Sequence, residues 1–130
     1  MRPLFEGVRD NPKRRTCMLM VTRACNLNCK YCYETYKEES YMSFETASAA
    51  IMKEADIVKH SDTFTELEID FMGGEPLMNF TLIQQVVEWL SSNPIGVPFI
   101  CFAITNGTLL TPERKEWFSK NKHLIWLGIS

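Results

Sequence analysis

The chain has 130 residues, of which 45% are hydrophobic and 23% are charged, a composition that suits one domain with one modest core and argues against a disordered chain. Its 14 Lys and Arg residues and 16 Asp and Glu residues give a formal net charge of −2, which offers no polycation to a nucleic-acid backbone. The longest nearly unbroken apolar stretch, 97–104, is far shorter than the roughly 20 residues of a membrane span, and residues 1–4 do not begin a signal peptide. We therefore expect a soluble, cytoplasmic protein that binds neither nucleic acid nor membrane.

The first segment, residues 1–16, is expected to be a lead-in to a single domain over 17–130. It contains two prolines, a glycine and the basic run 13–15. We interpret this run as solvated, with basic docking as the alternative.

Hydrophobic periodicity predicts three helices between four strands. The strands are short apolar or alternating runs, and the helices carry an apolar stripe behind the start signals Ser43 and Thr111-Pro112. In chain order the predicted elements are strand 17–22, helix 44–60, strand 66–72, helix 79–92, strand 97–105, helix 112–121 and strand 124–130. This order predicts an α/β fold, a parallel β-sheet with right-handed βα units and helices packed outside it. Because no helix follows the last strand, we expect a fragment of a larger (β/α) barrel or half-barrel.

Three of the five cysteines lie close together, as Cys25, Cys29 and Cys32. An odd cysteine count without a secretion signal indicates metal or redox chemistry in a reducing compartment. Three thiolates at these spacings can bind three corners of an iron-sulfur cube and leave the fourth iron open to another ligand. The alternative is a zinc site completed by a histidine, but neither His60 nor His123 has a zinc-finger spacing, and both are expected at the other edge of the sheet.

The other two cysteines, Cys17 and Cys101, lie inside predicted strands. We expect both to be small buried hydrophobic residues.

The unusual polar segments each follow a predicted strand, at the edge where ligands bind in parallel α/β structures. Gly73, Gly74, Glu75 and Pro76 combine open backbone with a carboxylate, which suits a ligand that carries an ammonium and a carboxylate, although an ordinary turn is the alternative.

Smaller polar groups follow the last two predicted strands. Thr105, Asn106 and Ser130 suit ribose hydroxyls or a substrate, while Asn106-Gly107 is equally a common turn pair. Tyr31, between two of the clustered cysteines, either packs in the core or shields a ligand. A flavodoxin-like nucleotide site is disfavoured because no Gly-rich phosphate loop follows the first strand.

Two motifs together resemble the radical S-adenosylmethionine (radical SAM) superfamily. They are Cys25-x3-Cys29-x2-Cys32, with the aromatic Tyr31 before the last cysteine, and the segment 73–76. The similarity extends over 17–130. The sequence is similar in particular to the peptide-modifying branch that includes anaerobic sulfatase-maturating enzymes. The segments that carry this similarity are 25–34, 72–77, 105–110 and 127–130.

This resemblance implies the N-terminal part of a (β/α)6 partial TIM barrel that holds two cofactors. Cys25, Cys29 and Cys32 would bind a 4Fe-4S cluster, and S-adenosylmethionine would chelate its fourth iron. Glu75 with the backbone of Gly73 and Gly74 would bind the methionine amino group, the backbone at Tyr31 would approach the adenine, and Ser130 would meet the ribose. Reductive cleavage would give a 5′-deoxyadenosyl radical, which abstracts a hydrogen atom from a peptide or protein, with flavodoxin or ferredoxin as the electron donor.

Members of that branch continue past the fourth strand with an Asp-Gly turn, two more strands and a C-terminal domain with auxiliary clusters. We therefore expect this chain to carry the cofactor-binding part and to be inactive on substrate alone. The exposed edge at 124–130 would favour self-association. The competing class is a non-catalytic binding module stabilised by zinc or a cluster, which would have no use for the carboxylate of Glu75.

Overall fold

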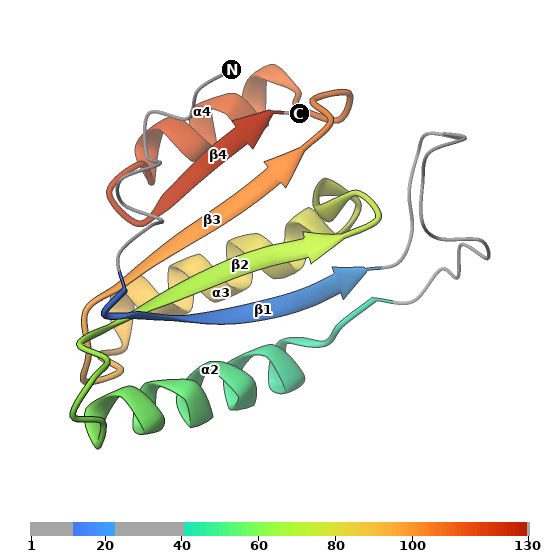
Figure 1. The fold of residues 1–130 in the computed structure, drawn as a ribbon. Coiled ribbons are helices and arrows are strands. Elements are labelled where there is room, and N and C mark those ends of the chain that lie inside the picture. The colour runs from blue at the N-terminus through green and yellow to red at the C-terminus, as the bar shows by residue number, and fades with distance from the viewer. Residues whose placement is uncertain (1–11, 23–40, 130) are drawn as a thin grey trace.

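The computed structural model describes residues 12–22 and 41–129. In these residues a four-stranded sheet alternates with helices (Figure 1). The elements are β1 (Arg14–Thr22), α2 (Phe44–Lys59), β2 (Glu66–Gly73), the 3-10 helix η1 (Pro76–Asn79), α3 (Phe80–Ser92), β3 (Phe99–Thr105), α4 (Pro112–Lys120) and β4 (Ile125–Ile129). The strands are parallel and their order across the sheet is β1-β2-β3-β4. The predicted α/β fold is therefore confirmed.

Two helices begin at the residues that the sequence indicates. Ser43 is the N-cap of α2 and its Oγ accepts a hydrogen bond from the backbone N–H of Thr46, at 3.2 Å. Thr111 does the same for α4, where its Oγ1 accepts from the N–H of Arg114 at 3.2 Å and Pro112 occupies the first turn. These caps satisfy N–H groups that have no partner inside the helix.

The helix predicted to begin near Asn79 is confirmed as α3, but the chain between β2 and α3 contains an element that was not predicted. A short 3-10 turn, η1, comes first, and α3 follows it directly. Pro76 suits the start of η1 because it has no backbone N–H that would need a hydrogen-bond partner there. The Glu75 side chain caps this turn by accepting a hydrogen bond from the N–H of Leu77. The loop after β2 is thereby a defined turn.

The hydrophobic core lies between one face of the sheet and the three helices. In Figure 1, α3 and α4 lie behind the sheet and α2 runs beside β1. The core combines alternate residues of the strands with the apolar stripes of the helices, among them Leu19, Ile69, Phe71, Ala103, Ile51, Ile83 and Phe118. Cys17 and Cys101 are both buried there with free thiols, as the sequence predicts.

The opposite face of the sheet carries buried charge on β2. Glu68 is 2% exposed and Asp70 is 4% exposed, so the alternating polar residues of this strand are buried like its apolar ones. The Arg14 side chain, 7% exposed, forms an ion pair of 3.1 Å with Glu66 and one of 3.6 Å with Glu68. Buried carboxylates need such partners because removing charge from water is costly.

This pairing corrects two expectations about the first strand and the residues before it. The first strand begins at Arg14 instead of Cys17, since Arg14 lies in register opposite Glu66. The interpretation of 13–15 as a solvated run is wrong for Arg14, whose side chain is buried against β2.

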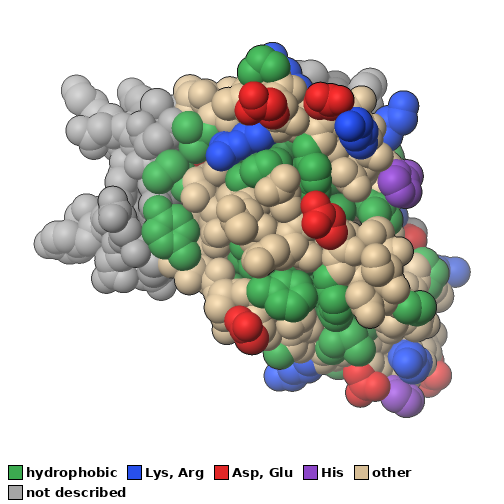
Figure 2. Space-filling model, turned by 180° about the vertical axis from the view of Figure 1, so that it is seen from behind, with side chains coloured by type: hydrophobic (Ala, Val, Ile, Leu, Met, Phe, Trp, Pro, Cys, Tyr) green, Lys and Arg blue, Asp and Glu red, His purple; other side chains and the backbone are tan. Residues whose placement is uncertain are grey.

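The outer surface over the helices mixes apolar and charged side chains. Seen from behind in Figure 2, apolar side chains are spread over that face, and acidic and basic side chains lie among them and along its margin. In the part of the chain that the structure describes, no helix is long and apolar enough to cross a membrane.

The two core thiols are expected to resist alkylation. Burial raises the pKa of Cys17 to about 11 and raises the pKa of Cys101 further. At pH 8 only about one Cys17 thiol in a thousand would be the reactive thiolate. Treatment of the native chain with iodoacetamide at pH 8, followed by peptide mass spectrometry, should find both residues unmodified, whereas unfolding in urea should expose both. Labelling of Cys101 in the native chain at the unfolded rate would contradict this core.

Candidate functional site

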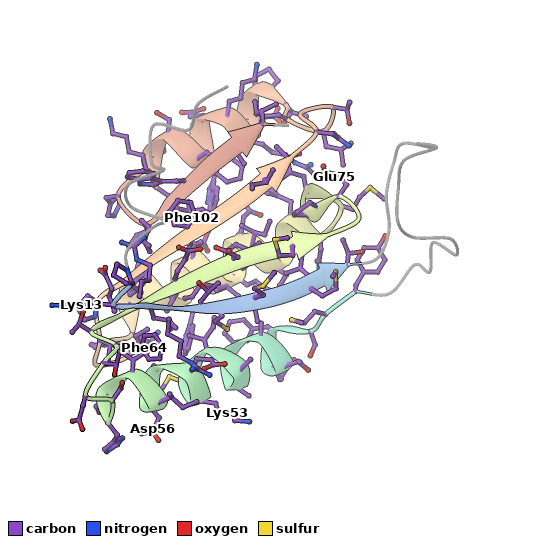
Figure 3. The ribbon with its side chains drawn as sticks, in the orientation of Figure 1. Lys13, Lys53, Asp56, Phe64, Glu75 and Phe102 are labelled. Carbon is purple, nitrogen blue, oxygen red and sulfur yellow. The ribbon has the colours of Figure 1, made fainter. Side chains whose placement is uncertain are left out.

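Glu75 joins two of the loops that follow strands. Its Oε2 accepts hydrogen bonds from the backbone N–H of Leu77 at 2.9 Å and from the hydroxyl of Thr105 at 2.6 Å. Its Oε1 accepts from the backbone N–H of Asn106 at 2.9 Å. Glu75 is 1% exposed and lies at the end of the sheet toward which the strands point (Figure 3). The loop after β2 and the loop after β3 are therefore held together by one buried carboxylate.

The polar side chains of the β3 loop form hydrogen bonds within the loop and to Glu75. The Thr105 hydroxyl donates to Glu75 and accepts from the N–H of Gly107 at 3.2 Å. The Asn106 side-chain oxygen accepts from the N–H and the hydroxyl of Thr108, at 3.0 and 2.7 Å. Gly107 has a φ of +85°, which a residue without Cβ adopts at no steric cost. Asn106 and Gly107 therefore form a turn, which was the alternative interpretation of this pair. Ribose binding by Thr105 and Asn106 stays a prediction.

Gly73 and Gly74 allow the end of β1 to approach closely. Gly73 lies in register opposite Thr22, and a Cβ on Gly73 would collide with the Thr22 carbonyl oxygen. The N–H of Gly74 donates to that same carbonyl at 3.1 Å. The glycine pair therefore has a structural task that sequence reasoning did not assign, in addition to any role in binding a ligand.

The cysteine-bearing segment begins and ends at this edge of the sheet. Thr22, the last residue of β1, forms an isolated antiparallel bridge with Tyr41, and the N–H of Met42 donates to the carbonyl of Val21 at 2.9 Å. The side chain of Asn79, which the sequence analysis did not single out, donates to Val21 O and Met42 O. Its place after the Gly-Gly-Glu-Pro segment was the only signal that could have drawn attention to it.

Several predicted site residues lie outside the described residues. They are Cys25, Cys29, Tyr31, Cys32 and Ser130. The nearest described residues are Thr22 and Tyr41 on the two sides of the cysteine segment, and Ile129 directly before Ser130.

The histidines of the zinc alternative lie away from Glu75. His60 caps the C-terminal end of α2, where its Nδ1 lies 3.0 Å from the carbonyl oxygen of Asp56. Figure 3 places Asp56 at the opposite end of the sheet from Glu75. Over residues 12–22 and 41–129, no group of three or more His, Cys, Asp or Glu side chains comes close enough to hold a metal ion.

The acceptor capacity of Glu75 fits a ligand with an ammonium group. A carboxylate offers about four acceptor positions, two on each oxygen. Among the described residues, both positions of Oε2 are used, by Leu77 and Thr105, while Oε1 accepts only from Asn106. One acceptor position on Oε1 therefore has no donor from residues 12–22 and 41–129, and it could take a charge-assisted hydrogen bond.

Comparison with known proteins identifies the family. The family model described as the Radical SAM superfamily matches residues 19–130. The chain belongs to the radical SAM superfamily. Members of this superfamily use a 4Fe-4S cluster and S-adenosylmethionine.

Individual relatives agree with this family and differ in their reactions. The chain is 40% identical over 114 residues to an uncharacterized protein of Methanocaldococcus jannaschii, covering 87% of this chain and 37% of that protein. It is 30% identical over 113 residues to the serine-type anaerobic sulfatase-maturating enzyme of Bacteroides thetaiotaomicron, covering 84% of this chain and 27% of the enzyme. The names of other relatives describe several different reactions.

A solved structure shares the fold. It is described as native anSMEcpe with bound AdoMet and Kp18Cys peptide, and it matches with a TM-score of 0.71 at 21% identity. The match covers 89% of this chain and 31% of that one. The chain thus spans about a third of the length of the relatives and structures that it resembles.

Removing the Thr105 hydroxyl should destabilise the chain. Thr105→Val keeps the shape but takes a donor from a buried carboxylate, which we expect to lower the free energy of unfolding by about 2 kcal/mol. Thr105→Ser keeps the hydroxyl and should lose less than half of that. Urea unfolding measures both. A loss in Thr105→Ser with none in Thr105→Val would mean that the methyl group matters and the bond to Glu75 does not.

A side chain at position 73 should disrupt the contact between β1 and β2. Gly73→Ala places a Cβ against the backbone of Thr22, and we expect a loss of about 1–3 kcal/mol from the strand ends moving apart. The comparison variant is Gly107→Asn, because asparagine tolerates positive φ and a Cβ there makes only an ordinary contact of 3.5 Å with Ile129. Thermal unfolding should rank Gly73→Ala as the more damaging change, and the reverse order would contradict this role.

Proposed function

We propose that this chain is the cofactor-binding part of a radical SAM enzyme that acts on a peptide or protein. Cys25, Cys29 and Cys32 would hold the 4Fe-4S cluster at the carboxyl end of β1. When bound, the cluster and S-adenosylmethionine would supply the 5′-deoxyadenosyl radical that abstracts a hydrogen atom from the substrate.

The residues of the sheet edge would bind and orient S-adenosylmethionine. Glu75 would accept a hydrogen bond from its ammonium at the remaining position of Oε1, while the bonds to Leu77 and Asn106 keep the carboxylate in place. Gly73, Gly74 and Pro76 would shape the backbone beside it. A carboxylate fixed by three protein donors needs little reorganisation to bind a cation, which favours a well-defined orientation of the ligand.

The single observation that carries this proposal is that the described residues on both sides of the cysteine segment lie at the edge that carries the Gly-Gly-Glu-Pro segment. The bridge between Thr22 and Tyr41 brings both ends of the cysteine segment to the edge that carries Glu75. The bond from Gly74 to Thr22 O joins the two loops directly. A structural metal site alone would not require a buried carboxylate on the neighbouring loop.

The assignments of Tyr31 and Ser130 remain part of the proposal. The backbone at Tyr31 would approach the adenine, and Ser130, directly after β4, would meet the ribose. Thr105 and Asn106 would act on the cofactor mainly through Glu75 and the shape of their loop.

Partners of the whole protein are also proposed. The peptide in the structure of anSMEcpe and the relative named as a sulfatase-maturating enzyme support a peptide or protein substrate. The electron donor would be a small redox protein such as flavodoxin or ferredoxin. β1 and β4 are the outer strands of the described sheet, and their edges would support self-association.

Anaerobic reconstitution tests the function directly. After incubation with iron and sulfide, the chain should bind about four irons, and the electron paramagnetic resonance spectrum of the reduced protein should change when S-adenosylmethionine is added. Cys29→Ser should lose most of this iron, whereas Cys101→Ala, which changes a core thiol, should retain it.

Other outcomes would contradict the proposal. Stoichiometric zinc without the iron signal would favour the non-catalytic binding module. Iron bound equally well by Cys29→Ser would refute the ligand assignment. A four-iron spectrum that does not change when S-adenosylmethionine is added would mean that the chain binds a cluster but lacks the proposed cofactor site.

A further inference from the structure

Asn79 connects three segments that are distant in the sequence. It is the last residue of η1, and its side-chain Nδ2 donates to the carbonyl of Val21 at 2.8 Å and to the carbonyl of Met42 at 3.3 Å. Val21 lies 58 residues before it and Met42 lies 37 residues before it. One amide group therefore holds the end of β1 and the beginning of the chain that leads to α2.

The carbonyl of Val21 is available for this contact because β1 is an outer strand of the described sheet and the next carbonyl, that of Thr22, is the one that binds Gly74. The register between β1 and β2 runs from Met20 opposite Met72 to Thr22 opposite Gly73, so Val21 has no partner residue on β2. In this chain, Val21 O accepts from both the N–H of Met42 and the side chain of Asn79.

Helix capping does not explain this asparagine. Asn79 occupies the N-cap position of α3, but its side chain makes no capping hydrogen bond. The amide is instead directed to the two carbonyls, which accept hydrogen bonds and cannot donate them. An N-cap role would accept aspartate equally well, whereas these two contacts require the N–H groups of the amide.

We propose that Asn79 is a positioning residue that fixes the base of the cysteine segment against the loop containing Glu75. The turn η1 would fix a different segment of the chain at each of its two ends. Glu75 at its start holds the β3 loop, and Asn79 at its end holds Val21 and Met42. The significance for the cluster rests on the proposed function, since Cys25, Cys29 and Cys32 lie between the two residues that Asn79 joins.

The substitution Asn79→Asp separates positioning from capping and from simple loss of volume. Aspartate has nearly the same shape and caps a helix well, and its negative charge suits a helix N-terminus. It would place carboxylate oxygens against the two carbonyl oxygens, so the base should open while α3 keeps its start. Asn79→Ala provides the milder loss of the same bonds.

Asn121→Asp is the matched control. The Asn121 Nδ2 also donates to a backbone carbonyl, that of Trp117 at 2.8 Å, and Asn121 is half-buried like Asn79. It lies after α4 and before β4, at the amino end of a strand, away from the edge that carries Glu75.

The first readout is hydrogen exchange of the Met42 amide in the full chain, measured by nuclear magnetic resonance beside the global stability from urea unfolding. Asn79→Asp should accelerate Met42 exchange at least tenfold relative to the wild type, beyond any change in global unfolding. Asn121→Asp should leave the Met42 rate unchanged. Met42 exchange that is unaltered in Asn79→Asp, or that changes only with global stability, would overturn the proposal.

The second readout is the iron bound per chain after anaerobic reconstitution, together with the paramagnetic resonance spectrum with and without S-adenosylmethionine. Asn79→Asp should bind less than half of the wild-type iron, and Asn121→Asp should match the wild type. Full iron binding with an unchanged spectrum in Asn79→Asp would refute the link to the cluster. If the wild type itself binds no iron, the proposed function fails, while Met42 exchange still decides whether Asn79 fixes the base.

Discussion

The site depends on a buried carboxylate whose hydrogen bonds are made by backbone and side-chain groups of two loops. Glu75 accepts from Leu77, Thr105 and Asn106, so the ends of β2 and β3 have a fixed relative position before any ligand is present. Burial of a charge is costly unless such donors are supplied. An ammonium ligand would need the same negative charge, so Glu75 would contribute both to the stability of the fold and to ligand binding.

The end of β1 can approach the loop of Glu75 because Gly73 has no side chain. Gly73 leaves room for the carbonyl of Thr22, and the N–H of Gly74 binds that carbonyl. Since Thr22 also pairs with Tyr41, the cysteine segment starts and returns beside the Gly-Gly-Glu-Pro turn. The Gly-Gly-Glu-Pro turn is thus hydrogen-bonded to the last described residue before the cysteine segment.

Periodicity and start signals predicted the fold well, because Ser43 and Thr111-Pro112 begin helices through local hydrogen bonds. The strand positions followed from apolar runs. Burial of the side chains of Arg14 and Glu68 could not be predicted, since it depends on pairing between strands that are distant in the sequence.

For the site, sequence placed Glu75 and Thr105 at one edge but could not reveal that they bind each other. Asn79 was missed for the same reason, because its partners are backbone carbonyls, which a sequence does not distinguish. The most direct measurement is a crystal structure of the full chain, reconstituted anaerobically and bound to S-adenosylmethionine. We predict that Glu75 keeps its bonds to Leu77, Thr105 and Asn106 and accepts a further bond from the ligand ammonium. An ammonium bound elsewhere, or a Glu75 released from the β3 loop, would contradict this account.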